Sequence, residues 1–245
     1  MGRPEKPVNH AVPARAKLAD FLRNRRAAAG LTYEQMARLP QTKDTPSAAT
    51  LKRAASGDTV PSWETVEEFV LMTLTQDEEF GGGLTTGLHQ GLELWIRARR
   101  ATRAPYDVHK APDPTLVSSR ADLSRALRRQ HIWAGYPTPG EMQRIAGSWS
   151  LPTSTARRTI AGDTLPVDPH QTMAFLKACY VLELAELEPW LHAAVRAHDY
   201  GGRWVRAHLS VVDAITAASA QNDPSDNSAS GKVVYLKGEG VERAA

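Results

Sequence analysis

Two pairs of adjacent basic residues, Lys52-Arg53 and Arg157-Arg158, lie in short polar segments that could form helices. The planar guanidinium of arginine donates a fork of hydrogen bonds that fits a phosphate or the edge of a guanine. Hydroxyl groups near each pair could add hydrogen bonds to a phosphate or a base; they belong to Ser47 and Thr50 in the first segment and to Thr153 and Ser154 in the second. These residues favour binding of a polyanion. The alternative is that each basic pair is only a solvated helix surface.

Residues that carry catalysis or hold metals are not grouped in this sequence. The eight histidines form no HxxxH or HExxH pattern, and the one cysteine excludes a CxxC motif. The segment Phe80-Gly-Gly-Gly-Leu lacks the Gly-Lys-Ser/Thr ending of a phosphate-binding loop and is typical of a turn. We therefore expect no enzyme activity, no metal and no cofactor.

The single cysteine and the N-terminal segment bear on cellular location. Cys179 lies in the apolar run MAFLKACYVLEL, which predicts a buried hydrophobic residue and not a redox group. One cysteine cannot form an intramolecular disulfide, as is usual in a reducing compartment. The N-terminus lacks the apolar core of a signal peptide, and charges interrupt every apolar run well before 18 residues. These observations predict a cytoplasmic protein without a membrane partner.

The net charge of +3 conceals a strong alternation along the chain. Residues 1–60 carry +6, residues 61–94 carry −7, residues 120–158 carry +5 and residues 159–199 carry −4. This pattern of a basic and then an acidic segment, twice over, indicates that the charge follows a repeated structural unit.

An internal repeat with an offset of 105 residues explains the alternation. The string R-x-x-x-G-D-T-[VL]-P begins at Arg53 and again at Arg158. Leu18, Leu22, Arg23 and Gly30 align with Leu123, Leu127, Arg128 and Gly135 at the same offset. After one extra residue in the second copy, Met36 aligns with Met142 and Phe69 with Phe175.

Each copy has the pattern of a run of short helices. In the first copy, Leu18, Phe21 and Leu22 have helical spacing and Gly30 is typical of a C-cap. Thr32 to Gln35 form a capping-box pattern, Ser47 can cap a third helix that ends near Gly57, and a fourth begins near Ser62. The second copy has capping-box patterns at Thr138 and Asp168. Only KVVYLK, near the C-terminus, has the alternation of a strand, so the predicted class is all-α.

This order of residues resembles the lambda-repressor-like (XRE-type) helix-turn-helix family. The first copy matches the family pattern with Leu22, Arg26, Gly30, Leu31, Thr32, Met36 and Ala37, followed by Leu51, Gly57 and Pro61. The resemblance covers residues 15–75 well and residues 118–182 less well. It implies two tandem helix-turn-helix domains with extra C-terminal helices. It further implies a sequence-specific regulator of transcription whose third helix lies in the major groove of duplex DNA.

Carried over by position, the resemblance implies a set of contacts for each copy. The implied DNA-binding residues are Ser47, Ala48, Ala49, Thr50, Lys52 and Arg53 in the first copy and Thr153, Ser154, Arg157 and Arg158 in the second. Contacts to phosphates would come from Thr32, Tyr33, Arg23, Arg26 and Arg128, although these arginines can equally be surface charges of the first helix.

The chain departs from the family at several positions. Tyr33 and Pro139 stand where the family has a glutamine that touches phosphate, and both turns are longer than usual. In the second copy Gln143 replaces a small alanine and Ala156 replaces the apolar anchor Leu51. The second copy therefore either reads DNA or serves as a surface for a partner or a dimer.

The predicted organisation has six parts. They are a flexible basic arm (1–14), helix-turn-helix domain 1 with acidic accessory helices (15–100), a Pro-rich extended linker (101–117), helix-turn-helix-like domain 2 (118–200), a C-terminal helix (201–220) and a flexible tail (221–245). The acidic segments either pack on the core or dock RNA polymerase or another regulator. The C-terminal helix, with an apolar face over 203–219, is a candidate homodimer seam. The rival function is a protein-interaction adaptor, of an antitoxin-like or plasmid or phage maintenance kind.

Overall fold

A computed structural model describes residues 5–39, 45–75, 78, 83–104 and 110–198 of the 245-residue chain. Every regular element in these ranges is a helix, which confirms the predicted all-α class. Contacts divide the chain into two units, residues 1–110 with 132–136 and residues 111–131 with 137–245. The candidate dimer helix at 203–219, the tail and the segment KVVYLK lie outside the described residues.

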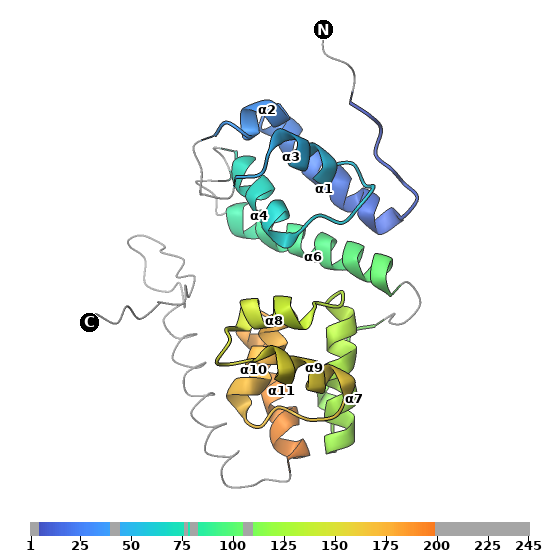
Figure 1. Ribbon diagram of the computed structural model, residues 1–245, viewed down its shortest axis with the longest axis vertical. Helices are drawn as coiled ribbons and strands as arrows, with labels where there is room; N and C mark the ends of the chain where they lie inside the picture. Colours follow the sequence, from blue (N-terminus) through green and yellow to red (C-terminus); the bar gives the residue numbers. More distant parts are fainter. Residues whose placement is uncertain (1–4, 40–44, 76–77, 79–82, 105–109, 199–245) are drawn as a thin grey trace, which may run out of the picture. The chain divides into compact units, whose positions relative to one another are not determined.

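The described part of the first unit consists of five helices (Figure 1). They are α1 (Pro13–Ala28), α2 (Tyr33–Met36), α3 (Ala48–Ala54), α4 (Trp63–Met72) and α6 (Gly83–Arg103). Helix α1 packs on α4 and α6, and α3 contacts both α2 and α4. The core is made by side chains that the helical spacing places inward, and these are fully buried: Leu18, Leu22, Met36, Leu51 and Phe69.

Short polar side chains set the starts of the helices in this unit. The Thr32 hydroxyl accepts the backbone N–H of Gln35, whose side chain accepts the N–H of Thr32 in return, so the predicted capping box is confirmed. Ser47 caps α3 through the N–H of Thr50, and Ser62 caps α4 in the same way. Each cap satisfies one of the free N–H groups that begin a helix.

Helix α6 is longer than the sequence predicts. It runs without interruption for 21 residues and ends at Arg103, three residues into the segment expected to be an extended linker. The first proline of that segment is Pro105, and a residue that precedes proline is disfavoured in helical geometry. Residues 101–103 therefore continue the helix until the proline ends it. Trp95 anchors α6 in the unit by donating from its indole N–H to the carbonyl of Pro61 at 2.8 Å.

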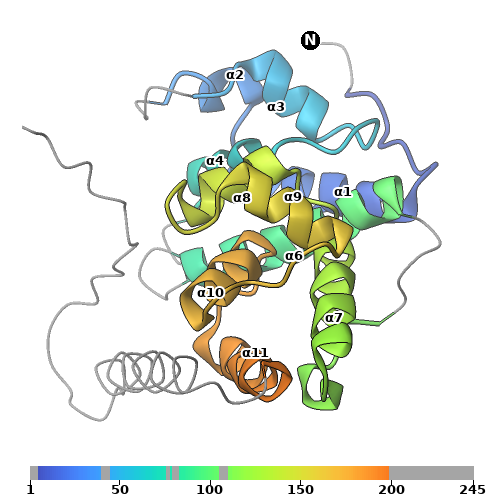
Figure 2. The same cartoon turned by 60° about the horizontal axis from the view of Figure 1, so that its bottom comes forward.

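The described part of the second unit consists of one short 3-10 helix, η1 (Pro114–Leu116), and five α-helices (Figure 2). They are α7 (Arg120–Trp133), α8 (Pro139–Ala146), α9 (Thr153–Ala161), α10 (Pro169–Ala178) and α11 (Leu184–Ala197). Helix α8 packs on α9 and α10, and α11 packs on α10 and η1. The buried side chains include the counterparts of the first core: Leu123, Leu127, Met142 and Phe175.

Candidate nucleic-acid interface

Helix α3 is held by one apolar edge and exposes the rest of its surface. Leu51 and Ala54 are buried against the core, at 0% and 4% exposure. Because residues three apart share a helix face, the neighbouring positions 49, 52 and 53 point away from that core. Ala49, Lys52 and Arg53 are exposed accordingly, and Ala48 and Thr50 are half-buried at the boundary.

The cations of α3 are not used inside the protein. Among the described residues, the side chains of Lys52 and Arg53 form no hydrogen bond and no ion pair. The hydroxyls nearby are engaged, since Ser47 Oγ accepts the N–H of Thr50 at 3.2 Å and lies 2.9 Å from the Thr50 hydroxyl. Lys52 and Arg53 can therefore bind an anion, whereas the hydroxyls of Ser47 and Thr50 are engaged at the N-terminus of α3.

An acidic residue of the N-terminal segment neutralises the other basic residues of this region. Glu5 forms ion pairs with Arg23 at 3.2 Å and Arg26 at 2.9 Å, and it accepts the hydroxyl of Tyr33 at 2.7 Å. Burial, together with the hydrogen bond and the charge of Glu5, raises the pKa of Tyr33 to about 12. We call Glu5, Arg23, Arg26 and Tyr33 the Glu5 cluster.

The Glu5 cluster engages Arg23, Arg26 and Tyr33 inside the first unit, and the phosphate contacts predicted for these residues stay a prediction. The side chains of both arginines are about one-fifth exposed, and Tyr33 is buried. Breaking two ion pairs to reach a phosphate would leave the Glu5 carboxylate without its partners. Thr32 remains exposed, but its hydroxyl and its N–H both belong to the capping box of α2.

The segment before α1 packs on the domain, which corrects the prediction of a flexible arm for residues 5–12. The backbone N–H of Asn9 donates to the carbonyl of Ser56 at 2.9 Å, and its side chain donates to Asp58 at 2.8 Å. Arg15 donates to the Asp58 carbonyl at 2.9 Å, and Lys6 lies 3.9 Å from the Asp58 carboxylate. The hydrogen bond from Asn9, followed by the charges of Lys6 and Arg15, lowers the pKa of Asp58.

The helix-turn-helix domain family matches residues 17–80, which span α1 to α4. The first unit contains a helix-turn-helix domain. The match covers about a quarter of the chain and includes the exposed basic pair of α3. No curated protein and no solved structure is similar to the chain. None of the helices in the described ranges is both long and apolar enough to span a membrane.

The second unit repeats several features of the helix-turn-helix domain. Thr138 and Glu141 form a complete capping box at the start of α8. Helix α9 begins at Thr153 and ends at Gly162, whose φ of +89° is a left-handed C-cap conformation that favours glycine. Arg157 and Arg158 are exposed on α9, and neither side chain forms a hydrogen bond or an ion pair within the described part of the chain.

Gln143 forms hydrogen bonds with Thr153, one of the residues predicted to bind DNA. Pro152, at the N-cap of α9, provides no side-chain acceptor. The side-chain oxygen of Gln143, on α8, instead accepts the backbone N–H of Thr153 at 3.2 Å and also the Thr153 hydroxyl. Thr153 is half-buried and engaged in this link, whereas Ser154 is exposed. The departure from the family alanine is therefore a cap that ties α8 to α9.

Leu151 supplies an apolar anchor that sequence reasoning missed. The alignment predicted that Ala156 replaces Leu51, and Ala156 is indeed fully buried. Its small side chain leaves space, and Leu151, two residues before α9 begins, is also fully buried. Leu151 is an apolar residue between a serine and a proline, and this was the only feature of the sequence that indicated a buried anchor.

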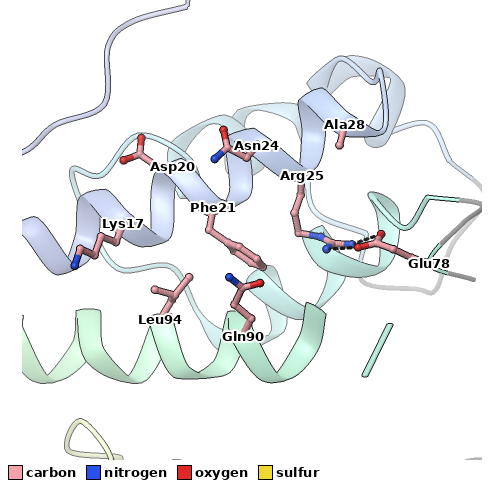
Figure 3. Close-up of a pocket in the computed structure, with 9 residues that line it drawn as sticks. All are labelled: Lys17, Asp20, Phe21, Asn24, Arg25, Ala28, Glu78, Gln90 and Leu94. Atoms are coloured by element: carbon pink, nitrogen blue, oxygen red, sulfur yellow. Dashed lines mark hydrogen bonds and ion pairs between the residues drawn. The ribbon is translucent and has the colours of Figure 1, made fainter. Parts of the chain in front are cut away.

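A groove of the first unit lies between α1 and α6 and has a volume of about 540 Å³ (Figure 3). Its one ion pair joins Arg25 and Glu78 at 2.9 Å, and Arg25 also donates to the hydroxyl of Thr73. The hydrogen bond from Arg25, with a further one from the N–H of Thr75, lowers the pKa of Glu78. The Arg25–Glu78 pair thus fixes α1 to the chain that follows α4. The described residues hold no cluster of three metal-ligating side chains.

Proposed function

We propose that this protein is a sequence-specific DNA-binding regulator of transcription, of the lambda-repressor-like (XRE) kind, in which α3 enters the major groove. The single observation that supports this most strongly is the exposed, unpaired Lys52-Arg53 pair on α3 of a helix-turn-helix domain. Leu51 buries the opposite side of α3, so these cations face outward as a base-reading helix requires.

The second unit acts as a second reader in this proposal. Arg157 and Arg158 occupy the same register as Lys52 and Arg53, and they are exposed and unpaired as well. Helix α9 is capped at both ends, by Gln143 and by Gly162, so the pair is carried on a well-formed helix. Because the other groove-facing residues differ between the copies, we expect an asymmetric DNA site.

Selection of bound sequences from random duplex DNA at physiological salt tests the proposal. Recovery of a defined sequence supports it, and recovery of none contradicts it. On the selected site, Arg53→Ala should weaken binding by about 1–3 kcal/mol and relax the preference at one position. Lys17→Ala removes an exposed charge from α1, outside the proposed interface, and is the matched control. Arg158→Ala should have a similar effect if the second unit reads bases, with the exposed Arg129→Ala as its control.

The salt dependence of DNA binding distinguishes binding by the first unit alone from binding by both units. The logarithm of the binding constant falls against the logarithm of salt concentration by about 0.9 for each phosphate neutralised. Removal of a cation that contacts a phosphate should therefore reduce the slope by about 0.9. If neither Arg157→Ala nor Arg158→Ala changes the slope or the affinity, a DNA-binding role of the second unit is contradicted.

A protein-interaction adaptor is the second candidate, because the second unit carries a large exposed aromatic residue. Trp149, in the turn between α8 and α9, is 98% exposed, and Ile145 on α8 is 42% exposed. Exposed tryptophans are enriched at protein interfaces. If Trp149→Ala leaves DNA binding unchanged but abolishes self-association or partner binding, the second unit is an interaction module. Dimerisation through 203–219 and contact with RNA polymerase stay predictions.

A further inference from the structure

The internal repeat makes one groove of the first unit directly comparable with one of the second. In the first unit, residues 5–9 lie in the groove between α1 and the Gly57-Asp58 corner. Arg23 donates to the carbonyls of Ala55 and Lys6, which holds this segment against the end of α3. The fit is close: a Cβ atom on Gly57 would lie 2.7 Å from the Asn9 carbonyl oxygen.

The matching groove of the second unit is empty of any described segment. It has a volume of about 410 Å³ and is lined on one side by residues of α7 and on the other by Gly162 to Leu165. At the offset of 105 residues, Arg120, Arg128 and Asp163 take the places of Arg15, Arg23 and Asp58. The atoms nearest to a Cβ atom on Gly162 would belong to the side chain of Arg128, at 3.4 Å, and not to a bound backbone segment as at Gly57.

The segment that precedes α7 is held elsewhere, which explains why this groove is not filled in the same way. Arg196 on α11 donates to the carbonyls of Val117 and Pro114 at 3.1 and 3.0 Å. These two bonds bind η1 to α11, so the counterpart of the Glu5 segment cannot turn back toward Gly162. The groove keeps Arg128 and Asp163, the counterparts of Arg23 and Asp58, whereas His131 stands where the first unit has Arg26.

The charges of the groove select its occupant. Arg125 stands where the first unit has Asp20, but it is paired with Asp122 at 3.1 Å, so the groove offers Arg120 and Arg128 on one side and Asp163 on the other. An acidic side chain can pair with Arg128, which within the described residues hydrogen-bonds only the carbonyl of Ser124 on its own helix. Asp163 is exposed, can accept a hydrogen bond from an amide or amine and would repel a phosphate. An extended peptide that carries both an acid and an amide or amine can bind Arg128 and Asp163 at the same time, whereas a nucleic-acid backbone offers only anions.

We infer that the groove between α7 and the Gly162-Asp163 corner binds an extended peptide segment of a partner protein that carries a carboxylate followed by an amide or amine, in the manner in which the first unit binds its own residues 5–9. The carboxylate of the peptide pairs with Arg128, and an amide or amine three or four residues later donates to Asp163. The backbone N–H of that residue donates to the carbonyl of Ala161, the counterpart of Ser56.

A labelled peptide with the sequence of residues 5–12, Glu-Lys-Pro-Val-Asn-His-Ala-Val, is the probe for fluorescence anisotropy with the full chain. We expect a dissociation constant below about 1 mM. Arg128→Ala should weaken binding about tenfold or more, the effect of a lost charge-assisted hydrogen bond. Arg129→Ala is the matched control, because Arg129 is an exposed neighbour on α7 that does not line this groove. The same peptide with Gln for its glutamate and Leu for its asparagine should not bind.

Asp163→Asn separates a peptide from a phosphate as the occupant. A peptide should bind more weakly to this variant, and duplex DNA should bind equally or more tightly. The inference is overturned if the peptide does not bind with a dissociation constant below about 1 mM. It is also overturned if Arg128→Ala and Arg129→Ala weaken peptide binding equally. A loss of peptide affinity in Arg23→Ala alone would overturn it as well, because the peptide would then replace residues 5–9 in the first groove. A loss of DNA affinity without a loss of peptide affinity in Arg128→Ala would do the same. DNA selection with the wild-type chain is unaffected by any of these outcomes, so it tests the proposed function separately.

Discussion

Replacement of Glu5 by glutamine tests whether the N-terminal segment is a structural part of the first unit. Glutamine keeps the size of the side chain and can still accept the hydroxyl of Tyr33. It removes the charge that pairs with Arg23 and Arg26. The change therefore isolates the two ion pairs.

The expected cost follows from the exposure of the partners. The Glu5 side chain is 26% exposed, and those of Arg23 and Arg26 are 19% and 21% exposed. Exposed ion pairs contribute about 0–1 kcal/mol, whereas removal of one partner from a fully buried pair costs about 3–5 kcal/mol. The Glu5 cluster lies between these limits, so we expect the free energy of unfolding of the first unit to fall by about 2 kcal/mol.

Chemical denaturation followed by circular dichroism measures this loss. Glu34→Gln is the matched control, because Glu34 is an exposed acid on α2 that forms no ion pair within the described ranges. The pKa of Tyr33 gives an independent check: without the charge of Glu5 it should fall from about 12 toward the ordinary tyrosine value. The raised pKa stabilises the fold below the ordinary tyrosine pKa, and this contribution is lost as the pH rises through about 12. Equal stability of Glu5→Gln and Glu34→Gln, with an unchanged Tyr33 titration, would refute the structural role.

Three further predictions concern the cores and the groove of Figure 3. Glu78→Gln should cost about 1 kcal/mol at neutral pH; because Arg25 lowers the pKa of Glu78, the difference from wild type should persist above the ordinary glutamate pKa and vanish as the pH falls through the lowered one. Leu151→Ala should destabilise the second unit by about 2–5 kcal/mol in denaturant titrations, and Leu182→Ala, at an exposed leucine, should be nearly neutral. Burial raises the pKa of the Cys179 thiol, so a thiol reagent should react with Cys179 only after the chain is denatured; fast labelling of the native protein would contradict this.

The starts of the helices could be predicted because they depend on residues close in sequence. A hydroxyl or carboxylate at the N-cap bonds an N–H three residues later, so the residue types alone indicate it. Thr32, Ser47, Ser62 and Thr138 all cap the helices that the sequence predicts. Asp168 caps α10 as well, although the side chain of Gln171 accepts the N–H of Val167 instead of completing the capping box.

The parts of the site that could not be predicted depend on polar contacts between distant residues. Glu5 lies 18 residues from Arg23 and 28 from Tyr33, and no periodicity links them. The predicted basic arm was defined by net charge, yet the acid within it makes the decisive contacts. Gln143 was recognised as a departure from the family pattern, but only the geometry reveals that it caps α9.

The two copies share a corner but differ in how much of their positive charge is available. The first sixty residues carry a formal charge of +6, but Lys6, Arg15, Arg23, Arg25 and Arg26 are bound to acids or carbonyls within the first unit. Among the described residues of the first unit, the exposed cations that form no ion pair include Lys17 on α1, Arg38 after α2, and Lys52 and Arg53 on α3. In the second unit, Arg128 and Arg120 lack a counterpart of Glu5, so the positive surface extends along α7 as well as α9. Under the proposed peptide binding, the second unit offers to an external partner the place that residues 5–9 fill in the first unit.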